Sequence, residues 1–187
     1  MENEPTNGIG TESVVLGGGC FWCVEAVYAL VEGVQKITSG YAGGKIKNPS
    51  YKEICTGLTD HAEVIKLVFD PKKISLADIL EIFWVSHDPT TPNQQGADAG
   101  TQYRSVIFYN SPEQKAIAQK SVAEVASTLY DAPIVTEISP LPAFYNAEGY
   151  HQNYYALNKM QPYCQIVINP KITKLRQKFA SKLKTNA

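Results

Sequence analysis

The pattern of apolar and polar positions predicts alternating strands and helices over the first two thirds of the chain. Runs rich in Val, Ile, Leu and aromatic residues predict strands at 12–16, 34–41, 62–69 and 103–109. Helical spacing places Val24, Val27, Tyr28 and Val31 on one face of a predicted helix at 20–31. A second helix is expected to begin after Ser75, a good N-cap, and a third spans 112–129.

The predicted order β-α-β-β-α-β matches the ferredoxin-like split unit, which is an α+β two-layer sandwich with a central mixed sheet. After a short predicted strand at 134–138, the chain is rich in Pro, Tyr and Asn. This composition predicts an irregular C-terminal region with a helix around 151–160. The last stretch, 171–184, is basic and places Ile172, Leu175 and Phe179 at helical spacing. That pattern favours a solvated amphipathic helix over a docking patch.

Length and charge narrow the class of protein. The 187 residues suit one domain over 1–187, with 1–11 as a flexible tail and 171–187 as a basic C-terminal segment. A net charge of -1 gives no electrostatic reason to expect nucleic acid or an anionic membrane as partner. No secretory signal or membrane-spanning run is visible. We expect a cytoplasmic monomer.

The sharpest local signal is a cysteine that follows three glycines where a strand passes into a helix. The glycines Gly17 to Gly19 allow close approach to Cys20, and a helix N-terminus favours a thiolate. Such a thiol is a competent nucleophile. The alternative is a buried, inert cysteine, which the glycine-flanked helix start makes the less favoured interpretation.

The spacing of Cys20 and Cys23 leaves two further alternatives open. One is half of a zinc site, in a zinc-stabilised interaction module, but the remaining cysteines and histidines are scattered singly. The other is a thioredoxin-type redox pair, which the predicted order of elements disfavours. With four cysteines and no visible signal peptide, we expect the thiols to persist in a reducing compartment.

Alternation along the strand at 62–69 places Glu63 on the same side as Ile65, Leu67 and Phe69. A carboxyl group that leads an apolar row is partly desolvated, and desolvation raises its pKa. Glu63 would then hold a proton near neutral pH and could donate it. Taken alone, a strand-end glutamate that reaches solvent is the more ordinary interpretation.

Several blocks between Gly17 and Tyr163 occur together in a characteristic order. They are Gly19-Cys-Phe-Trp22, Gly40-Tyr-Ala-Gly-Gly44, Asn48-Pro-Ser-Tyr51, His61-Ala-Glu63, His87-Asp-Pro89, Gln95-Gly-Ala-Asp98 and Gly100-Thr-Gln-Tyr-Arg-Ser105. In this combination the chain closely resembles the A-type peptide methionine sulfoxide reductases. The resemblance implies thiol-dependent reduction of methionine S-sulfoxide, free or in proteins, with no bound cofactor and with thioredoxin or a similar dithiol protein as reductant.

The resemblance also implies roles for individual residues. Cys20 is similar to the nucleophile, Glu63 to the proton donor, and Tyr51 and Tyr103 to hydroxyls that bind the sulfoxide oxygen. Phe21 and Trp22 resemble the wall that holds the substrate methyl group, Asp98 matches an acidic site residue, and Tyr163-Cys164 resembles the C-terminal pair that carries a resolving thiol.

Two thiols are candidates for condensing with a Cys20 sulfenic acid. The resemblance favours Cys164, in a Pro- and Tyr-rich stretch expected to be mobile, and Cys23 is kept as a second resolver or relay. For other residues we expect structural roles: Cys55 as a small buried residue, Trp84 in the core, and His87 ordering a loop. Tyr150, Tyr154 and Tyr155 beside His151 could line the site, but a tyrosine-rich surface is the more ordinary interpretation.

Overall fold

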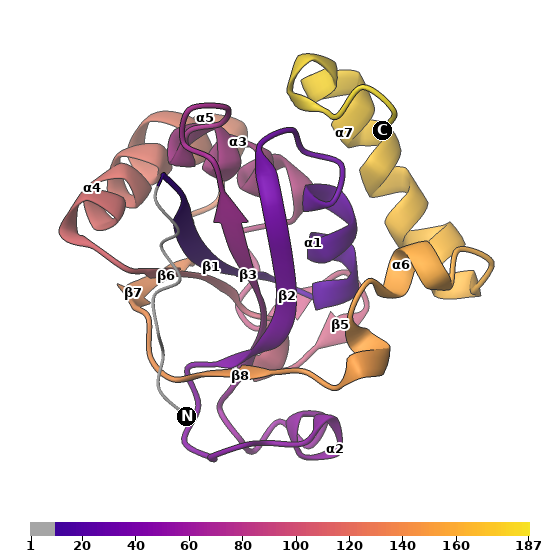
Figure 1. The fold of residues 1–187 in the computed structure, drawn as a ribbon. Helices are drawn as coiled ribbons and strands as arrows, with labels where there is room; N and C mark the ends of the chain where they lie inside the picture. Colours follow the sequence, from indigo (N-terminus) through magenta and orange to yellow (C-terminus); the bar gives the residue numbers. More distant parts are fainter. Residues whose placement is uncertain (1–9) are drawn as a thin grey trace.

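The computed structural model describes residues 10–187, so residues 1–9 of the predicted tail lie outside the described residues. The strands of the main sheet are β1 (Glu12–Gly18), β2 (Val34–Ala42), β3 (Ala62–Phe69), β6 (Ser105–Tyr109), β7 (Glu137–Pro140) and β8 (Phe144–Asn146). Within the described residues they form one six-stranded sheet in the order β7-β6-β1-β3-β2-β8 (Figure 1). Neighbours are antiparallel except β6 and β7, which are parallel, so the sheet is mixed as predicted.

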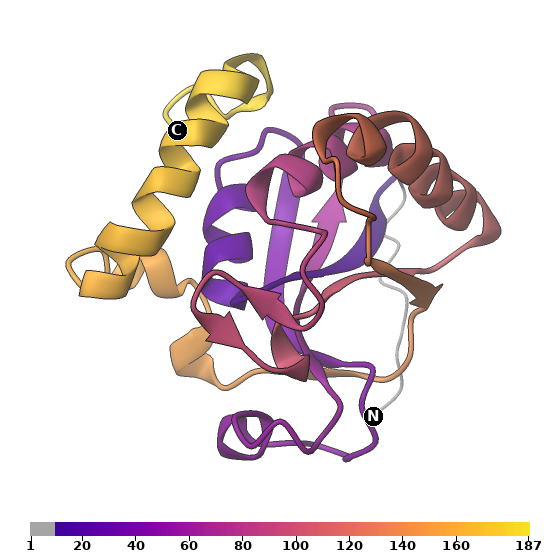
Figure 2. The same cartoon turned by 180° about the vertical axis from the view of Figure 1, so that it is seen from behind.

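Helices cover one face of this sheet. The α-helices are α1 (Phe21–Tyr28), α2 (Tyr51–Ile54), α3 (Leu76–Ser86), α4 (Pro112–Ser121), α5 (Ser127–Leu129), α6 (Tyr154–Leu157) and α7 (Asn169–Phe179). The main apolar cluster joins α1, α3 and the C-terminal end of α7 to the sheet face that carries Ile65, Leu67 and Phe69. Both views show α7 alongside α1 (Figures 1 and 2). The architecture is therefore α+β.

The opposite face of the sheet carries a smaller apolar cluster that includes Val15, Val64 and Phe108. Leu141 and Phe144, from the chain after β7, pack against it. The alternation predicted for 62–69 is confirmed, because Val64 lies on this face while Ile65 lies on the helix-covered face.

Local sequence explains where the principal elements begin. Ser75 caps α3 through its hydroxyl, which accepts from the Asp78 amide, and the Asp78 carboxylate accepts from the Ser75 amide in return. The strands β1, β2 and β3 begin at the predicted residues. The strand β6 begins two residues later than predicted, because 101–103 form a 3-10 turn.

Elements after residue 130 differ from the sequence-based expectation. The strand predicted at 134–138 is wrong in position: the Val135 amide donates to the Pro89 carbonyl at 2.9 Å, and parallel pairing with β6 begins only at Glu137. The helix predicted at 151–160 is reduced to α6, because Asn153 adopts a left-handed conformation with φ 55°. A helical run from Cys164 to Lys182 replaces much of the expected irregular region.

The basic segment is amphipathic, as predicted. Ile172, Leu175 and Phe179 are buried, while Lys174, Arg176 and Lys178 are exposed. Within the described part of the chain, no helix has the length and apolar character needed to cross a membrane.

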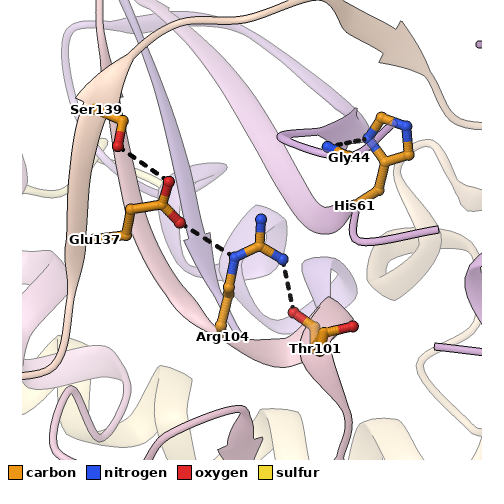
Figure 3. A network of polar contacts seen from close by, with 6 residues as sticks. All are labelled: Gly44, His61, Thr101, Arg104, Glu137 and Ser139. Atoms are coloured by element: carbon orange, nitrogen blue, oxygen red, sulfur yellow. Dashed lines mark hydrogen bonds and ion pairs between the residues drawn. The ribbon is translucent and has the colours of Figure 1, made fainter. Parts of the chain in front are cut away.

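One polar network fixes the segment that enters β6. The Arg104 guanidinium donates to the Glu137 carboxylate at 3.2 Å and to the Thr101 carbonyl at 2.9 Å, and the Ser139 hydroxyl donates to the same carboxylate (Figure 3). Glu137 and Ser139 lie on β7, so the network ties this edge strand to the turn that precedes β6. That turn carries Tyr103, one of the residues predicted to act on the substrate.

Candidate active site

Cys20 lies where β1 passes into α1. Gly19, just before it, has φ 92°, a conformation that side chains disfavour, and a Cβ there would lie 2.6 Å from the Gln95 side chain. Cys20 is the N-cap residue of α1 and is buried. The predicted strand–glycine–cysteine–helix arrangement is therefore present, with β3 adjacent to β1 in the sheet.

Glu63 lies at the start of β3 and is only 2% exposed. Its Oε2 accepts a hydrogen bond from the Phe21 amide, the first amide of α1, at 3.2 Å. Burial raises the pKa of Glu63 to about 8, and the charge of Asp98 adds to this effect, while the Phe21 amide opposes it. The predicted desolvated carboxyl group is confirmed: at neutral pH it holds a proton that it can donate.

The expected thiolate at Cys20 is not favoured in this structure. Burial raises the pKa of Cys20 well above its ordinary value, with contributions from the Cys23 hydrogen bond and the Glu63 charge. A helix N-terminus is worth about 0.3–1 kcal/mol at an exposed position, whereas full burial can shift a pKa by up to about 3–5 units. The rise in the Cys20 pKa caused by desolvation is therefore larger than the lowering that the N-terminus of the short helix α1 can cause.

Cys23 is the more acidic member of the pair. Its pKa is lowered to about 7, chiefly because the Cys20 thiol hydrogen-bonds to it. Its sulfur also lies 3.5 Å from the Tyr163 hydroxyl. Of the two thiols, Cys23 is therefore the one that ionises first.

Cys164 lies in the same apolar cluster as Cys20 and Cys23, together with Ala26, Ile168 and Ile172. It is wholly buried, within the π-helical turn Cys164–Ile168 that leads into α7. The expectation that it lies in an irregular stretch is therefore wrong, because this thiol lies in a helix that packs against α1. The mobility of this stretch stays a prediction.

Tyr163 and Asp98 close one side of the thiol cluster. The Tyr163 hydroxyl donates to the Asp98 carboxylate at 2.8 Å. Asp98 lies in β5 (Asp98–Ala99), which forms a short hairpin with β4 (Gln94–Gln95). The structure thus brings Asp98 and Tyr163 into contact, although the sequence analysis assigned them to the site independently of each other.

Tyr51, on α2, and Tyr103, in the 3-10 turn before β6, lie near enough to Glu63 for its charge to act on both. Burial raises the pKa of both phenols, and the charge of Glu63 raises both further. Tyr103 packs with the thiol cluster, and Cys20 also contributes to its raised pKa. Both hydroxyls therefore remain protonated at neutral pH and can donate hydrogen bonds beside the carboxyl group.

Aromatic rings surround the start of α1. Phe21 is buried against Tyr41, with ring centroids 5.7 Å apart, and against His151 at 5.1 Å. Trp22 is half-buried and stacks on Tyr154, with ring centroids 3.7 Å apart and planes 7° from parallel. Next to Cys20 in the sequence, the Phe21 ring is therefore buried, and the Trp22 ring is partly exposed.

The segment 148–154 contributes more to the site than the favoured surface interpretation predicted. His151 is wholly buried rather than on a tyrosine-rich surface, and Tyr154 stacks on Trp22. Glu148 accepts hydrogen bonds from the Tyr51 amide and the Tyr41 hydroxyl, each at 3.1 Å. The available signal was the dense run of Tyr and His itself, but its ring contacts depend on a long-range return to α1.

The structure decides three of the structural expectations. Cys55 is exposed, so its assignment as a buried residue is wrong: it lies at the end of the short surface helix α2. Trp84 is buried in the core and donates to the Ser121 hydroxyl at 2.7 Å. His87 is buried, with one ring nitrogen 2.6 Å from the Phe83 carbonyl and the other 2.7 Å from the Ser105 hydroxyl, in the ordering role predicted.

Among residues 10–187, no group of three or more His, Cys, Asp or Glu is placed to hold a metal ion.

Comparison with known proteins gives consistent matches over most of the chain. Residues 12–183 match the family described as "Peptide methionine sulfoxide reductase". The "Peptide methionine sulfoxide reductase MsrA" of Trichodesmium erythraeum is 56% identical over 169 residues, which cover 90% of this chain and 96% of the relative.

Two solved structures are also similar. Reduced Mxr1 from Saccharomyces cerevisiae has a TM-score of 0.80 and 36% identity, covering 84% of this chain and 91% of that chain. Mxr1 in complex with Trx2 has a TM-score of 0.57 and 26% identity, covering 82% and 89%.

The raised pKa of Glu63 predicts a pH dependence of stability. In the folded protein this carboxyl keeps its proton up to about pH 8, whereas the ordinary value is 4.5. Between these values the folded state binds more protons than the unfolded state, so stability falls as pH rises. The Glu63 contribution is complete below its unfolded pKa and is lost as pH approaches and passes its folded pKa.

Urea unfolding at about pH 5 and about pH 8 measures this effect. Glu63→Gln, which does not titrate, should lose less stability over that interval than the unmodified protein. Glu81→Gln, at an exposed position on α3, should behave like the unmodified protein. Equal losses in the unmodified protein and Glu63→Gln would contradict the raised pKa.

Proposed function

Because the chain belongs to the peptide methionine sulfoxide reductase family, whose reaction is the reduction of methionine sulfoxide to methionine, we propose that Cys20 is its nucleophile and Glu63 its proton donor. The observation that carries this assignment is the pairing of the two groups at one helix start. The Phe21 amide that follows Cys20 donates to Glu63, so the thiol and a protonated carboxyl are held beside each other.

In the first step the Cys20 sulfur attacks the sulfoxide sulfur while Glu63 protonates the sulfoxide oxygen. Tyr51 and Tyr103 donate hydrogen bonds to that oxygen as its charge develops. The adduct then collapses: an S–O bond forms between this oxygen and the Cys20 sulfur, while the sulfur–sulfur bond of the adduct and the S–O bond of the substrate break. Cys20 is left as a sulfenic acid, and the substrate sulfur departs as methionine. The thiol hydrogen replaces the proton that Glu63 gave, so the step is one oxygen transfer that yields methionine.

Aromatic and polar side chains bind different parts of the substrate. Phe21 and Trp22 hold the apolar methyl group. Asp98 and Tyr163 are hydrogen-bonded to each other near the Cys23 thiol, and the Tyr163 ring meets the Trp22 ring edge-on with centroids 5.8 Å apart. A pocket with one apolar and one proton-donating side distinguishes the two arrangements of groups about the sulfur atom. We assign the S epimer, free or in proteins, as the substrate.

In the second step a thiol condenses with the sulfenic acid, which releases water and forms a disulfide. We assign this role to Cys164, and its burial in one apolar cluster with Cys20 supports the assignment. Cys23 is the alternative resolver or relay. Its low pKa and its hydrogen bond with Cys20 favour it as a nearby thiolate.

Reduction of the disulfide requires an outside dithiol, for which we propose thioredoxin or a similar protein. The structure of the similar yeast protein Mxr1 in complex with Trx2 supports this partner. The proposed mechanism needs thiols that persist in a reducing compartment, and we therefore propose a cytoplasmic location. We propose that the enzyme acts as a monomer, without a bound cofactor and without nucleic acid or membrane as partner.

For the fold we propose a single domain with a ferredoxin-like two-layer centre. The adjacent strands β6-β1-β3-β2 are all antiparallel, with α1 between β1 and β2 in sequence and α3 between β3 and β6. Both helices pack on one face. This is the order expected of a split β-α-β pair.

The proposed function is tested first at the nucleophile. Cys20→Ser should abolish reduction of methionine sulfoxide even with excess dithiothreitol, because the serine hydroxyl cannot attack the sulfoxide sulfur at neutral pH. Methionine release measured by chromatography gives the result. The same substitution at the exposed Cys55 should leave activity in place. Residual turnover by Cys20→Ser close to that of the unmodified protein would show that another group is the nucleophile.

The second test removes the transferable proton. Glu63→Gln keeps the shape of the side chain, and we expect the single-turnover rate of methionine release to fall by roughly 10²–10⁴ and to lose its pH dependence. Glu81→Gln is the matched control on the exposed face of α3. An unchanged single-turnover rate in Glu63→Gln would remove this residue from the mechanism.

The third test identifies the resolving thiol. With thioredoxin as reductant, Cys164→Ser should stop recycling while the first methionine is still released, because the sulfenic acid then lacks its partner. Mass spectrometry after one turnover identifies the bridged cysteines. If Cys164→Ser recycles normally and Cys23→Ser does not, the two assignments are exchanged.

A further inference from the structure

Trp22 is held from two sides by one short segment that lies far away in the sequence. Its indole Nε1 donates to Nδ1 of His151 at 3.0 Å, and the Tyr154 ring stacks on its face with ring centroids 3.7 Å apart. Both partners follow β8, whereas Trp22 lies in the first turn of α1. The orientation of this ring is therefore set by the C-terminal part of the chain.

The hydrogen bond fixes the chemical state of His151. An indole N–H can only donate, so Nδ1 must accept and the ring proton lies on Nε2. This Nε2 is buried without a hydrogen-bond partner in the described structure. Burial also lowers the pKa of His151, which keeps the ring neutral. Protonation of Nδ1 would remove the acceptor that Trp22 uses.

The segment that carries His151 is itself anchored at two points. Glu25 lies three residues after Trp22 on α1, and its carboxylate accepts from the Asn153 amide at 2.6 Å. The Gln152 side chain pairs with both the amide and the carbonyl of Ser39 on β2, each at 2.9 Å. His151 and Tyr154 are therefore fixed relative to the helix and the sheet.

We propose that His151 is a positioning residue that determines selectivity for the substrate methyl group. It fixes the Trp22 indole, and Trp22 with Phe21 forms the wall against which the methyl group lies. This inference rests on the proposed function, which places the methyl group at that wall. A fixed ring leaves room for a methyl group and excludes an ethyl group, whereas a ring free to tilt admits both.

Comparison of methionine sulfoxide with ethionine sulfoxide tests the proposal. One methylene in an apolar pocket is worth about 10–200-fold in kcat/KM, and we expect the unmodified enzyme to prefer the methyl substrate within this range. His151→Phe keeps a ring but loses the acceptor, and this preference should fall by roughly 3–10-fold, mainly because the KM for ethionine sulfoxide falls. His151→Asn should retain most of the preference, because its Oδ1 replaces Nδ1 as acceptor.

Tyr155→Phe is the matched control. It removes a hydrogen bond from the same segment, that of the Tyr155 hydroxyl to Asn169 at 2.7 Å. A general loosening of the C-terminal segment would change selectivity in this variant as well, whereas the proposal predicts no change. A loss of folded enzyme lowers kcat/KM equally for both substrates and leaves their ratio unaltered.

The indole N–H resonances provide an independent measurement. The chain has two tryptophans, and Trp84 donates to Ser121 deep in the core. In ¹⁵N-labelled protein, His151→Phe should shift the Trp22 resonance and speed its exchange with water while the Trp84 resonance stays in place. In His151→Asn the Trp22 resonance should stay slow to exchange.

An unchanged methyl-to-ethyl preference in His151→Phe, with the Trp22 resonance shifted, would overturn the proposal. If His151→Phe does not fold, Tyr154→Leu decides: this half-buried ring stacks on Trp22, and its loss must lower the preference. The proposed function fails separately, if the unmodified protein reduces neither sulfoxide.

Discussion

A single buried carboxyl group sets the geometry on which the rest of the site depends. Glu63 is the second residue of β3, and the hydrogen bond from the Phe21 amide fixes the start of α1 against that strand. Because the carboxyl is desolvated, it keeps its proton at neutral pH. The same contact therefore fixes the backbone at Cys20 beside this carboxyl group, while His151 and Tyr154 orient the Trp22 ring. Tyr51 and Tyr103 are partly buried near this group, and its charge raises the pKa of both phenols.

The parts of this arrangement that follow from local pattern were predictable. Side chains along 62–69 point alternately to the two faces of the sheet. The face that Glu63 occupies could therefore be inferred from Ile65, Leu67 and Phe69. The cap at Ser75 and the glycines before Cys20 act within a few residues of chain. For the same reason, the first three strands begin where the pattern placed them.

What the sequence did not reveal depends on long-range packing. The position of β7 is decided by pairing with β6 and by the bond from Val135 to Pro89, neither of which leaves a periodic signal. His151 reads as part of a polar, tyrosine-rich run and is wholly buried, because the chain returns to α1 and covers Trp22. The acidity of Cys20 was misjudged, since its depth of burial is a property of the fold rather than of the motif.

The burial of Cys164 links the chemistry to the local stability of the fold. A sulfur atom with no exposed surface cannot be reached by the thiol of another protein. Attack on the Cys164 sulfur of a disulfide therefore requires the turn Cys164–Ile168 to separate from α1, whereas attack on its partner sulfur does not. The apolar contacts of Ile168 and Ile172 hold this turn closed, so the accessibility of the Cys164 sulfur depends on how often the turn opens. Mutations at Ile168 or Ile172 that weaken this packing would thereby make the Cys164 sulfur more accessible to an outside thiol.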